Sequence, residues 1–309
     1  MAISFDQLRQ DDQFAVRTKI RSGAYCDHTS GLANGFLQAN LVILEQSYAL
    51  DFMRFCQRNP KPCPLVGVTD TGSPFMRTLG ADIDIRSDVP SYHIYRHGVL
   101  DGTVGDITDL WNDQMVGFAL GCSFTFEHAL IRAGIPIWHI DNDQTVPMFK
   151  TNIKTIESGP FSGPIVVSMR AIPIDKLDMV RVISANFSMA HGTPVHWGDP
   201  TEIGIADLNA PDWGDSSPVN DGEIAVFWAC GVTRDWPAQG LRARSICGTQ
   251  HAAVGDGGFA AVDWLAFLQC WSRLLGWSSR RAGRHVFAGL RGHRRCRSAG
   301  SDNYARPKG

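Results

Sequence analysis

The stretch GCSFTFEHAL, at residues 121–130, places a thiol, a hydroxyl and a carboxylate around the predicted start of a helix. If the helix begins at Ser123, the N–H groups of its first turn and the positive end of the helix dipole point toward Cys122. Such a turn lowers the pKa of a thiol, and it can bind a carboxylate or a phosphate. Glu127 lies about one turn further along and is the better candidate for a general acid or base. In the alternative, Cys122 is a small buried residue and Glu127 only stabilises the first helical turn.

Three more side chains could act on the same kind of substrate. Arg170, in the apolar stretch VVSMRAIP, can bind a carboxylate through two parallel hydrogen bonds, or it pairs with a structural aspartate. His191 and His196, in HGTPVHWGD, could form a base with an orienting partner. Their spacing matches no zinc signature, so no metal is expected.

Two asparagines and a second cysteine complete the set of candidates. Asn40 in QANL and Asn152 in FKTNI are amides within apolar stretches, where each is either a ligand contact or a tie to the local backbone. Cys230 follows the apolar run EIAVFWA, at a strand end of the kind where α/β proteins place their binding loops. Together these residue types predict a site for an anionic small molecule, with Ser123 among its contacts.

The composition of the 309-residue chain is that of a globular protein, with 44% hydrophobic and 19% charged residues. A net charge of −2 gives no reason to expect nucleic acid as a partner, and no apolar run is long enough to cross a bilayer. The start MAISFDQLRQ lacks a secretory pattern, and the eight cysteines have no regular spacing. We therefore expect a cytoplasmic protein with free thiols, no cofactor, and neither nucleic acid nor a membrane as partner.

Hydrophobic periodicity and turn residues predict helices and strands in mixed order over the first 234 residues. Helices are predicted at residues 5–23, 47–59, 106–121, 123–134 and 174–187. Strands are predicted at residues 64–70, 81–102 (as a pair), 135–141, 159–173, 191–200 and 223–233, with a short apolar element at 38–45. This mixture is typical of an α/β (mixed α+β) protein with a smaller second lobe.

The composition changes near residue 235. Residues 1–234 contain 17 Lys and Arg against 27 Asp and Glu, whereas residues 235–309 contain 12 basic and 4 acidic residues. Outside VDWLAFLQCWSRLLGW, this basic C-terminal extension lacks sustained periodic patterning. Three explanations stay open: a shifted reading frame in GC-rich coding sequence, a disordered extension, and a tail that binds nucleic acid or a membrane surface.

Several longer stretches resemble one known family in order and with few gaps. They are GLANGFLQANLVIL, DFMRFCQRNPKPCPL, DITDLWNDQMVGFALGCSFTFEHAL, VPMFKTNI, GPFSGPIVVSMRAIP, GTPVHWGDPTEIGIADL and EIAVFWACGVT, within residues 15–233. On these residues the chain resembles the bacterial "putative hydro-lyase" family related to D-glutamate cyclase. The turn GAYCDHTSG departs from the family pattern, and after ACGVT the resemblance is expected to end at the change of composition.

The resemblance implies two lobes and a dehydrating lyase. The larger, three-layer lobe would comprise residues 1–160 and 205–234, and the smaller, two-layer lobe residues 162–204, with 81–104 as a further candidate. The implied reaction closes D-glutamate to 5-oxo-D-proline and water. Arg170 and the Cys122–Ser123 turn would then hold carboxylates, while Glu127 or a histidine moves protons. Two other functions stay open: a non-catalytic carboxylate-binding protein, and a protein that uses the basic tail on nucleic acid or a membrane surface.

Overall fold

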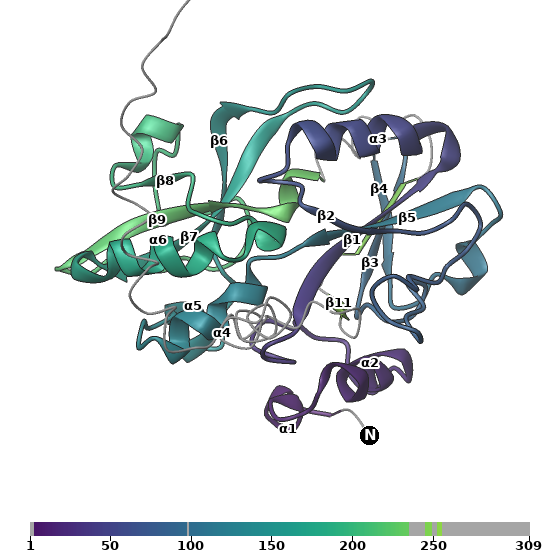
Figure 1. The fold of residues 1–309 in the computed structure, drawn as a ribbon, viewed down its shortest axis with the longest axis horizontal. Helices are drawn as coiled ribbons and strands as arrows, with labels where there is room; N and C mark the ends of the chain where they lie inside the picture. Colours follow the sequence, from purple (N-terminus) through teal and green to yellow (C-terminus); the bar gives the residue numbers. More distant parts are fainter. Residues whose placement is uncertain (1–2, 98, 235–244, 249–251, 255–309) are drawn as a thin grey trace, which may run out of the picture. The chain divides into compact units, whose positions relative to one another are not determined.

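The computed structural model describes residues 3–97, 99–234, 245–248 and 252–254. Two antiparallel β-sheets form the framework of this part of the chain, and the longer helices pack against them (Figure 1). The α/β class expected from the sequence is therefore confirmed. In the same described residues, no helix is both long and apolar enough to span a membrane.

Among the described residues the first sheet has seven strands, in the order β2-β5-β1-β10-β3-β4, with β11 also paired to β1. The strands are β1 (Leu37–Glu45), β2 (Leu65–Val68), β3 (Tyr92–Arg96), β4 (Val99–Val104), β5 (Met115–Gly121), β10 (Ser245–Gly248) and β11 (Ala252–Val254). Every pairing is antiparallel. Strands β10 and β11 come from the segment beyond residue 235, so part of the predicted extension belongs to this sheet.

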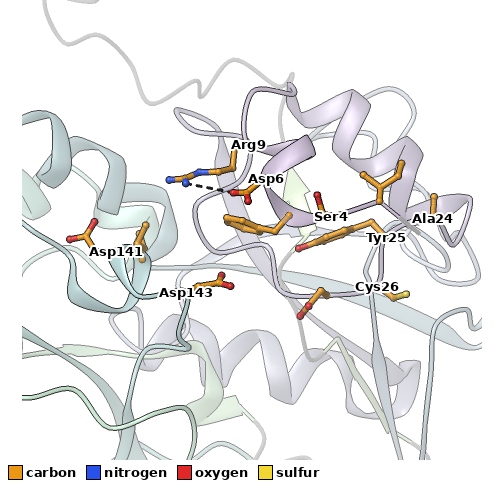
Figure 2. Close-up of a pocket in the computed structure, with 12 residues that line it drawn as sticks. Ser4, Asp6, Arg9, Ala24, Tyr25, Cys26, Asp141 and Asp143 are labelled. Carbon is orange, nitrogen blue, oxygen red and sulfur yellow. Dashed lines mark ion pairs between the residues drawn. The ribbon is translucent and has the colours of Figure 1, made fainter. Parts of the chain in front are cut away.

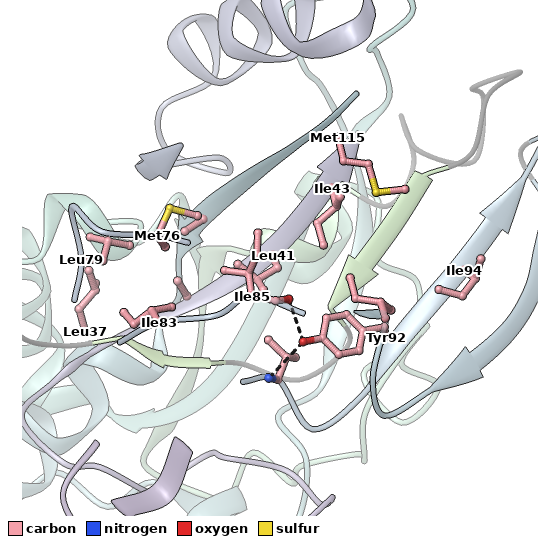
Figure 3. Close-up of a cluster of buried hydrophobic side chains, with 14 residues drawn as sticks. Leu37, Leu41, Ile43, Met76, Leu79, Ile83, Ile85, Tyr92, Ile94 and Met115 are labelled. Carbon is pink, nitrogen blue, oxygen red and sulfur yellow. Dashed lines mark hydrogen bonds between the residues drawn. The ribbon is translucent and has the colours of Figure 1, made fainter. Parts of the chain in front are cut away.

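Strand β1 is buried on both faces, which explains its continuous apolar run from Leu41 to Leu44. Leu41 and Ile43 contribute to a hydrophobic cluster on one face of the sheet (Figure 3). Val42 and Leu44 point to the opposite face and pack against α3 (Gln46–Arg58). Because successive side chains of a strand point to opposite faces, only a strand covered on both sides needs apolar residues at every position.

The second sheet has the order β6-β7-β9-β8 and is also antiparallel. Its strands are β6 (Met148–Lys154), β7 (Pro164–Pro173), β8 (His196–Trp197) and β9 (Glu223–Ala229). Ile172 and Trp228 face a cluster that includes Phe126 and Val180 from two helices. In addition to α3, the described residues form the helices α1 (Phe5–Leu8), α2 (Gln13–Arg21), α4 (Phe124–Arg132), α5 (Trp138–Asp141) and α6 (Leu177–Ala185).

Short 3-10 turns connect several of these elements. They are η1 (Thr108–Leu110), η2 (Ile174–Lys176), η3 (Ser188–Ala190), η4 (Pro200–Ile203) and η5 (Gly231–Arg234). The turn η3 matters most for the site, because it packs against the end of β5. A Cβ atom at Gly121 would lie only 1.7 Å from the carbonyl oxygen of Met189, so this approach requires glycine.

Three predicted elements are wrong. The segment predicted as a helix at 106–121 contains the turn η1 and strand β5, whose continuous apolar run MVGFALG fits a buried strand as well as a buried helix. The strand predicted at 135–141 contains the helical turn α5, and the first predicted helix is two helices. That helix is interrupted because the side chain of Asp12 accepts a hydrogen bond from the N–H of Ala15 at 2.8 Å and caps α2.

The remaining predicted elements are either confirmed or shorter than predicted. The pair of strands predicted at 81–102 is confirmed as β3 and β4, although both begin after residue 91. The strand at 191–200 is reduced to the two residues of β8. The helices at 47–59, 123–134 and 174–187 are confirmed, as are the strands at 64–70, 159–173 and 223–233. Strand β9 pairs with β7, which joins residues that had been expected in different lobes. The boundaries of the two lobes stay a prediction.

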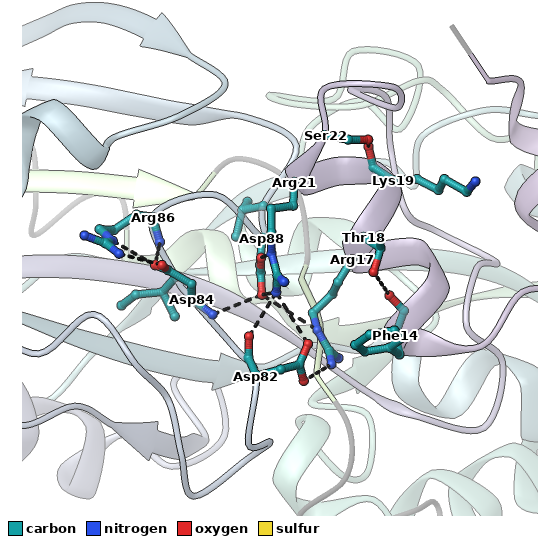
Figure 4. Close-up of polar contacts among 12 residues, drawn as sticks. Phe14, Arg17, Thr18, Lys19, Arg21, Ser22, Asp82, Asp84, Arg86 and Asp88 are labelled. Atoms are coloured by element: carbon teal, nitrogen blue, oxygen red, sulfur yellow. Dashed lines mark hydrogen bonds and ion pairs between the residues drawn. The ribbon is translucent and has the colours of Figure 1, made fainter. Parts of the chain in front are cut away.

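A buried network of ion pairs fixes α2 to the segment before β3 (Figure 4). Arg17 lies 2.7 Å from Asp82, and Arg21 donates two hydrogen bonds to Asp88, at 2.7 and 2.8 Å. The side chains of Arg17 and Asp88 are completely inaccessible to solvent. Asp88 also accepts the backbone N–H of Asp84 at 3.0 Å, so the carboxylate organises the loop as well as the helix.

We expect Asp88→Asn to lower the free energy of unfolding by about 3 kcal/mol, because the buried Arg17 and the partly exposed Arg21 would then share a single carboxylate, that of Asp82. Urea unfolding of both proteins at neutral pH measures this difference. The matched control is Asp101→Asn in the solvent-exposed Arg96–Asp101 pair, where the change should stay below about 1 kcal/mol. Equal effects at the two positions would contradict a structural role for the buried network.

Candidate active site

A buried arginine on the second sheet is bound by a glutamate from α4. The Nε of Arg170, on β7, donates to Oε1 of Glu127 at 3.0 Å, and its Nη2 donates to the same oxygen. Nη2 also donates to the hydroxyl of Ser123 at 2.9 Å, and Nη1 donates to that of Ser168 at 3.1 Å. The Ser123 and Glu127 contacts come from the start of α4, so the guanidinium links the helix to the sheet.

Aromatic rings flank the same guanidinium. Its central carbon lies 5.4 Å from the ring centre of Phe126 and 5.3 Å from that of Trp228. Both rings are buried, so they keep water from the ion pair and strengthen its attraction. A guanidinium has five N–H donors, and the four hydrogen bonds above leave one on Nη1 without an acceptor in the described part of the chain.

Glu127 has a second basic neighbour, His139, which α5 contributes. Nε2 of His139 lies 3.0 Å from Oε1 of Glu127, and both side chains are buried. Burial alone would raise the pKa of Glu127, but the charge of Arg170 and the contact with His139 outweigh it and lower that pKa to about 2. The carboxylate therefore stays ionised at neutral pH. Its other oxygen, Oε2, has no hydrogen-bond partner among the described residues.

His191 lies beside this cluster and is a neutral base. It follows η3 with a left-handed backbone (φ of 78°), and its Nδ1 lies 2.7 Å from the carbonyl oxygen of Lys61. Because a carbonyl only accepts, Nδ1 carries the proton and Nε2 presents a lone pair. Burial is the main cause that lowers the pKa of His191 to about 4. The charges of Arg170 and Lys61 also lower this pKa, whereas the hydrogen bond to the carbonyl of Lys61 raises it. Within the described residues, the buried Nε2 has no partner.

Asn40 lies within β1, and two thiols directly follow strands: Cys122 follows β5 of the first sheet, and Cys230 follows β9 of the second. The Nδ2 of Asn40 is buried without a hydrogen-bond partner in the described chain, and a Cβ atom at Gly231 would approach it to 2.4 Å. The Sγ of Cys230 lies 3.5 Å from the sulfur of Met148. Burial raises the pKa of the Cys122 thiol far above its usual value, and nearby Cys230 adds to the effect. The thiol of Cys122 is therefore protonated at neutral pH.

Comparison with known proteins identifies the family. The D-glutamate cyclase family matches residues 116–253. A protein of Dinoroseobacter shibae named "Putative hydro-lyase" is 59% identical over 257 residues, which cover 82% of this chain and 85% of the relative. One of the same description from Ruegeria pomeroyi is 60% identical over 233 residues, 75% of this chain and 85% of the relative.

The chain belongs to this bacterial hydro-lyase family related to D-glutamate cyclase. The family match extends to residue 253, so the expectation that the resemblance ends near residue 234 is wrong. Residues 245–248 and 252–254, at the C-terminal end of the matched range, form strands of the first sheet. The rest of the predicted 235–309 extension lies outside the described residues.

The structure brings most of the predicted site residues of this family member together. Ser123, Glu127 and Arg170 are in direct contact, and the charge of Arg170 acts on His191. Cys122 lies beside Ser123, and its pKa is affected by Cys230, Glu127 and Arg170. Asn40 approaches Gly231, the residue that follows Cys230. These seven residues remain candidates for the site.

The other two predicted residues have different neighbours. The Nε2 of His196 lies 2.8 Å from the carbonyl oxygen of Asp199, and its ring packs on Phe227. Asn152 is exposed and donates to the carbonyl of Glu202 at 3.5 Å. Among the described residues, neither side chain has a hydrogen bond or ion pair with Glu127 or Arg170. His196 and Asn152 therefore lie outside the Arg170–Glu127 cluster.

At residues 121–123, where the sequence predicts an anion-binding turn, two backbone N–H groups are already hydrogen-bonded to other parts of the chain. The N–H groups of Gly121 and Cys122 donate to the carbonyls of Pro64 and Gln38, both at 2.9 Å. The N–H of Thr125 donates to the carbonyl of Cys122 at 3.0 Å. Burial, and not the helix terminus, dominates the pKa of Cys122, which is raised where the sequence predicts that it is lowered. The side chain of Ser123 is thus the main polar contact that this turn offers.

Sequence reasoning missed His139, Ser168 and Lys61. Ser168 could have been found, because it precedes Arg170 by two residues and a strand places such neighbours on one face. His139 was hidden by the wrong assignment of its segment to a strand. Lys61 lies in the turn NPKPCP and carries no sequence signal for its contact with a histidine 130 residues later.

A separate surface pocket of about 680 Å³ lies between the N-terminal segment and α5 (Figure 2). Its lining includes Asp6, Asp141 and Asp143, with Arg9 paired to Asp6. None of the predicted site residues lines it. Its carboxylates do not suit the anionic ligand expected from the sequence.

Replacing Glu127 with glutamine should lower the free energy of unfolding by about 3 kcal/mol at pH 7, because a carboxylate with a depressed pKa stabilises the folded state when ionised. That contribution is present above the ordinary pKa of 4.5 and disappears as the pH falls toward 2. Urea unfolding at several pH values should therefore show the two proteins converging below pH 4.5. A difference independent of pH would contradict the ionised pair.

Proposed function

We propose that this chain is a hydro-lyase that removes water from a small carboxylic acid, with D-glutamate, which closes to 5-oxo-D-proline, as the first substrate to test. Family membership supports the reaction class. The observation that carries the proposal within this chain is His191. Its Nε2 is a buried, unprotonated and unpartnered base beside the charge of Arg170.

The proposed ring closure balances through proton transfer alone. The amino nitrogen of D-glutamate attacks the γ-carboxyl carbon, a C–N bond forms, and a C–O bond breaks. The ammonium group loses two protons in all, and the departing oxygen gains two protons and leaves as water. Nε2 of His191 can accept a proton from the nitrogen and return it to the leaving oxygen, so one base serves both steps.

Arg170 is assigned the carboxylate-binding role in this proposal. Its remaining Nη1 donor can bind a substrate oxygen, while its bonds to Glu127, Ser123 and Ser168 fix the plane of the guanidinium. Glu127 then acts as the residue that positions Arg170, because a group with a pKa near 2 is a poor proton donor at neutral pH. The amide of Asn40 is a second donor for the substrate.

Cys122 and Cys230 are assigned no covalent step. The thiolate is the nucleophilic form of cysteine, and burial raises the pKa of Cys122 far from neutral pH. Both side chains are buried, and Cys230 contacts Met148. They shape the apolar side of the proposed site.

His191→Gln should reduce turnover at least about 100-fold, because it removes the proposed base while an amide keeps some of the polar contacts. Loss of D-glutamate and formation of 5-oxo-D-proline can be followed by chromatography, together with a panel of small amino and hydroxy acids. His196→Gln is the matched control, since His196 lies outside the cluster, and it should stay within about threefold of the parent protein. Full activity of folded His191→Gln would refute the proposed base, and binding of these acids without turnover would favour a carboxylate-binding protein.

The pH dependence gives an independent check on the same base. Because the pKa of His191 is lowered to about 4, the base remains unprotonated through pH 5–7. We expect kcat/KM to fall only as the pH drops through about 4, well below the ordinary histidine value of 6.5. Rates of the purified protein in overlapping buffers measure this limb, and an acid limb at 6.5 would contradict a buried neutral imidazole.

A further inference from the structure

The side chain of Lys61 joins the turn after α3 to the loop that follows His191. Its ammonium donates to the carbonyl oxygen of Thr193, to the hydroxyl of Thr193 at 2.8 Å, and to the carbonyl oxygen of Pro194 at 3.4 Å. These three acceptors are neutral. Among the described residues Lys61 has no carboxylate partner, which is unusual for a half-buried ammonium group.

The backbone of the same residue makes a second link to this loop. The carbonyl oxygen of Lys61 lies 2.7 Å from Nδ1 of His191 and selects the tautomer with a lone pair on Nε2. One residue therefore contacts positions 191, 193 and 194 through two different groups. The base of the turn is itself anchored, because Asn59 exchanges hydrogen bonds with Ile156, at 2.7 and 2.8 Å.

The backbone of His191 needs such support. A residue other than glycine in the left-handed region is strained by roughly 1–3 kcal/mol, and it keeps that conformation only when its surroundings impose it. On one side, η3 packs against Gly121, where no side chain fits. On the other side, the loop 191–194 is held by the two links from Lys61 and by the N–H of Gly192, which donates to the carbonyl of Phe187 at 3.0 Å.

We propose that Lys61 is a positioning residue, which holds the loop 191–194 so that His191 keeps a single tautomer with Nε2 directed to the reacting groups. This inference rests on the proposed function of His191 as the base. Lys61 itself touches no reacting atom in this scheme. Its effect on turnover comes from the orientation of the imidazole.

The test compares Lys61→Met, which removes the ammonium and keeps an aliphatic chain, with Lys61→Arg, which restores N–H donors. The exposed Lys154→Met is the matched control. Nitrogen NMR of protein labelled in histidine reads the tautomer, with the His191 signals assigned by their loss in His191→Gln. We expect distinct protonated Nδ1 and unprotonated Nε2 signals in the parent protein, and averaged signals in Lys61→Met.

Kinetics on the same variants provide the second readout. Lys61→Met should lower kcat about 10- to 100-fold with little change in KM, and Lys61→Arg should recover most of the loss. If Lys61→Met does not fold, Thr193→Val removes one acceptor and should produce the same changes to a smaller degree. Unchanged signals and kcat in Lys61→Met, or in Thr193→Val where that variant replaces it, would overturn the proposal.

The NMR result also separates this inference from the proposed function. A tautomer that changes in Lys61→Met supports the positioning role even if His191→Gln retains full turnover, in which case only the role of His191 as the base fails. A tautomer that does not change overturns the positioning role even if His191→Gln is inactive.

Discussion

The buried pair of Arg170 and Glu127 sets the conditions for everything around it. Removing either charge from water is costly, and the cost is recovered only when geometry and additional hydrogen bonds are favourable. Here the serine hydroxyls, the aromatic rings and His139 supply that environment. The start of α4 is consequently fixed against the middle of β7, and the residues at the ends of β5 and β9 are held close by.

The same arrangement separates the roles of residues that are similar in chemistry. Glu127 and His191 are both buried titratable groups, and the pKa of each is lowered. A lowered pKa keeps the glutamate charged, but it keeps the histidine neutral. Two basic neighbours keep the glutamate ionised, whereas burial and nearby cations keep the histidine neutral. At neutral pH one group is a fixed anion and the other is a free base, and only the second is suited to exchanging protons with a substrate.

The sequence allowed some of this arrangement to be predicted and concealed the rest. The helix after Ser123 and the strand containing Arg170 follow from local periodicity, so the side chains were found in the correct local setting. That Arg170 binds Glu127 depends on packing between distant segments, which no local pattern encodes. Strand β5 was mistaken for a helix because a run that is buried on both faces loses the alternation that identifies a strand.

The position of β10 between β1 and β3 has a consequence for the folding of the protein during its synthesis on the ribosome. Strands β2, β5 and β1 can pair with one another early, and β3 and β4 form their own hairpin. The two parts share no strand until residues 245–248 have been synthesised. During translation, one edge of β1 therefore stays unpaired until residues far along the chain have been synthesised. An unpaired strand edge can pair with other chains during this interval.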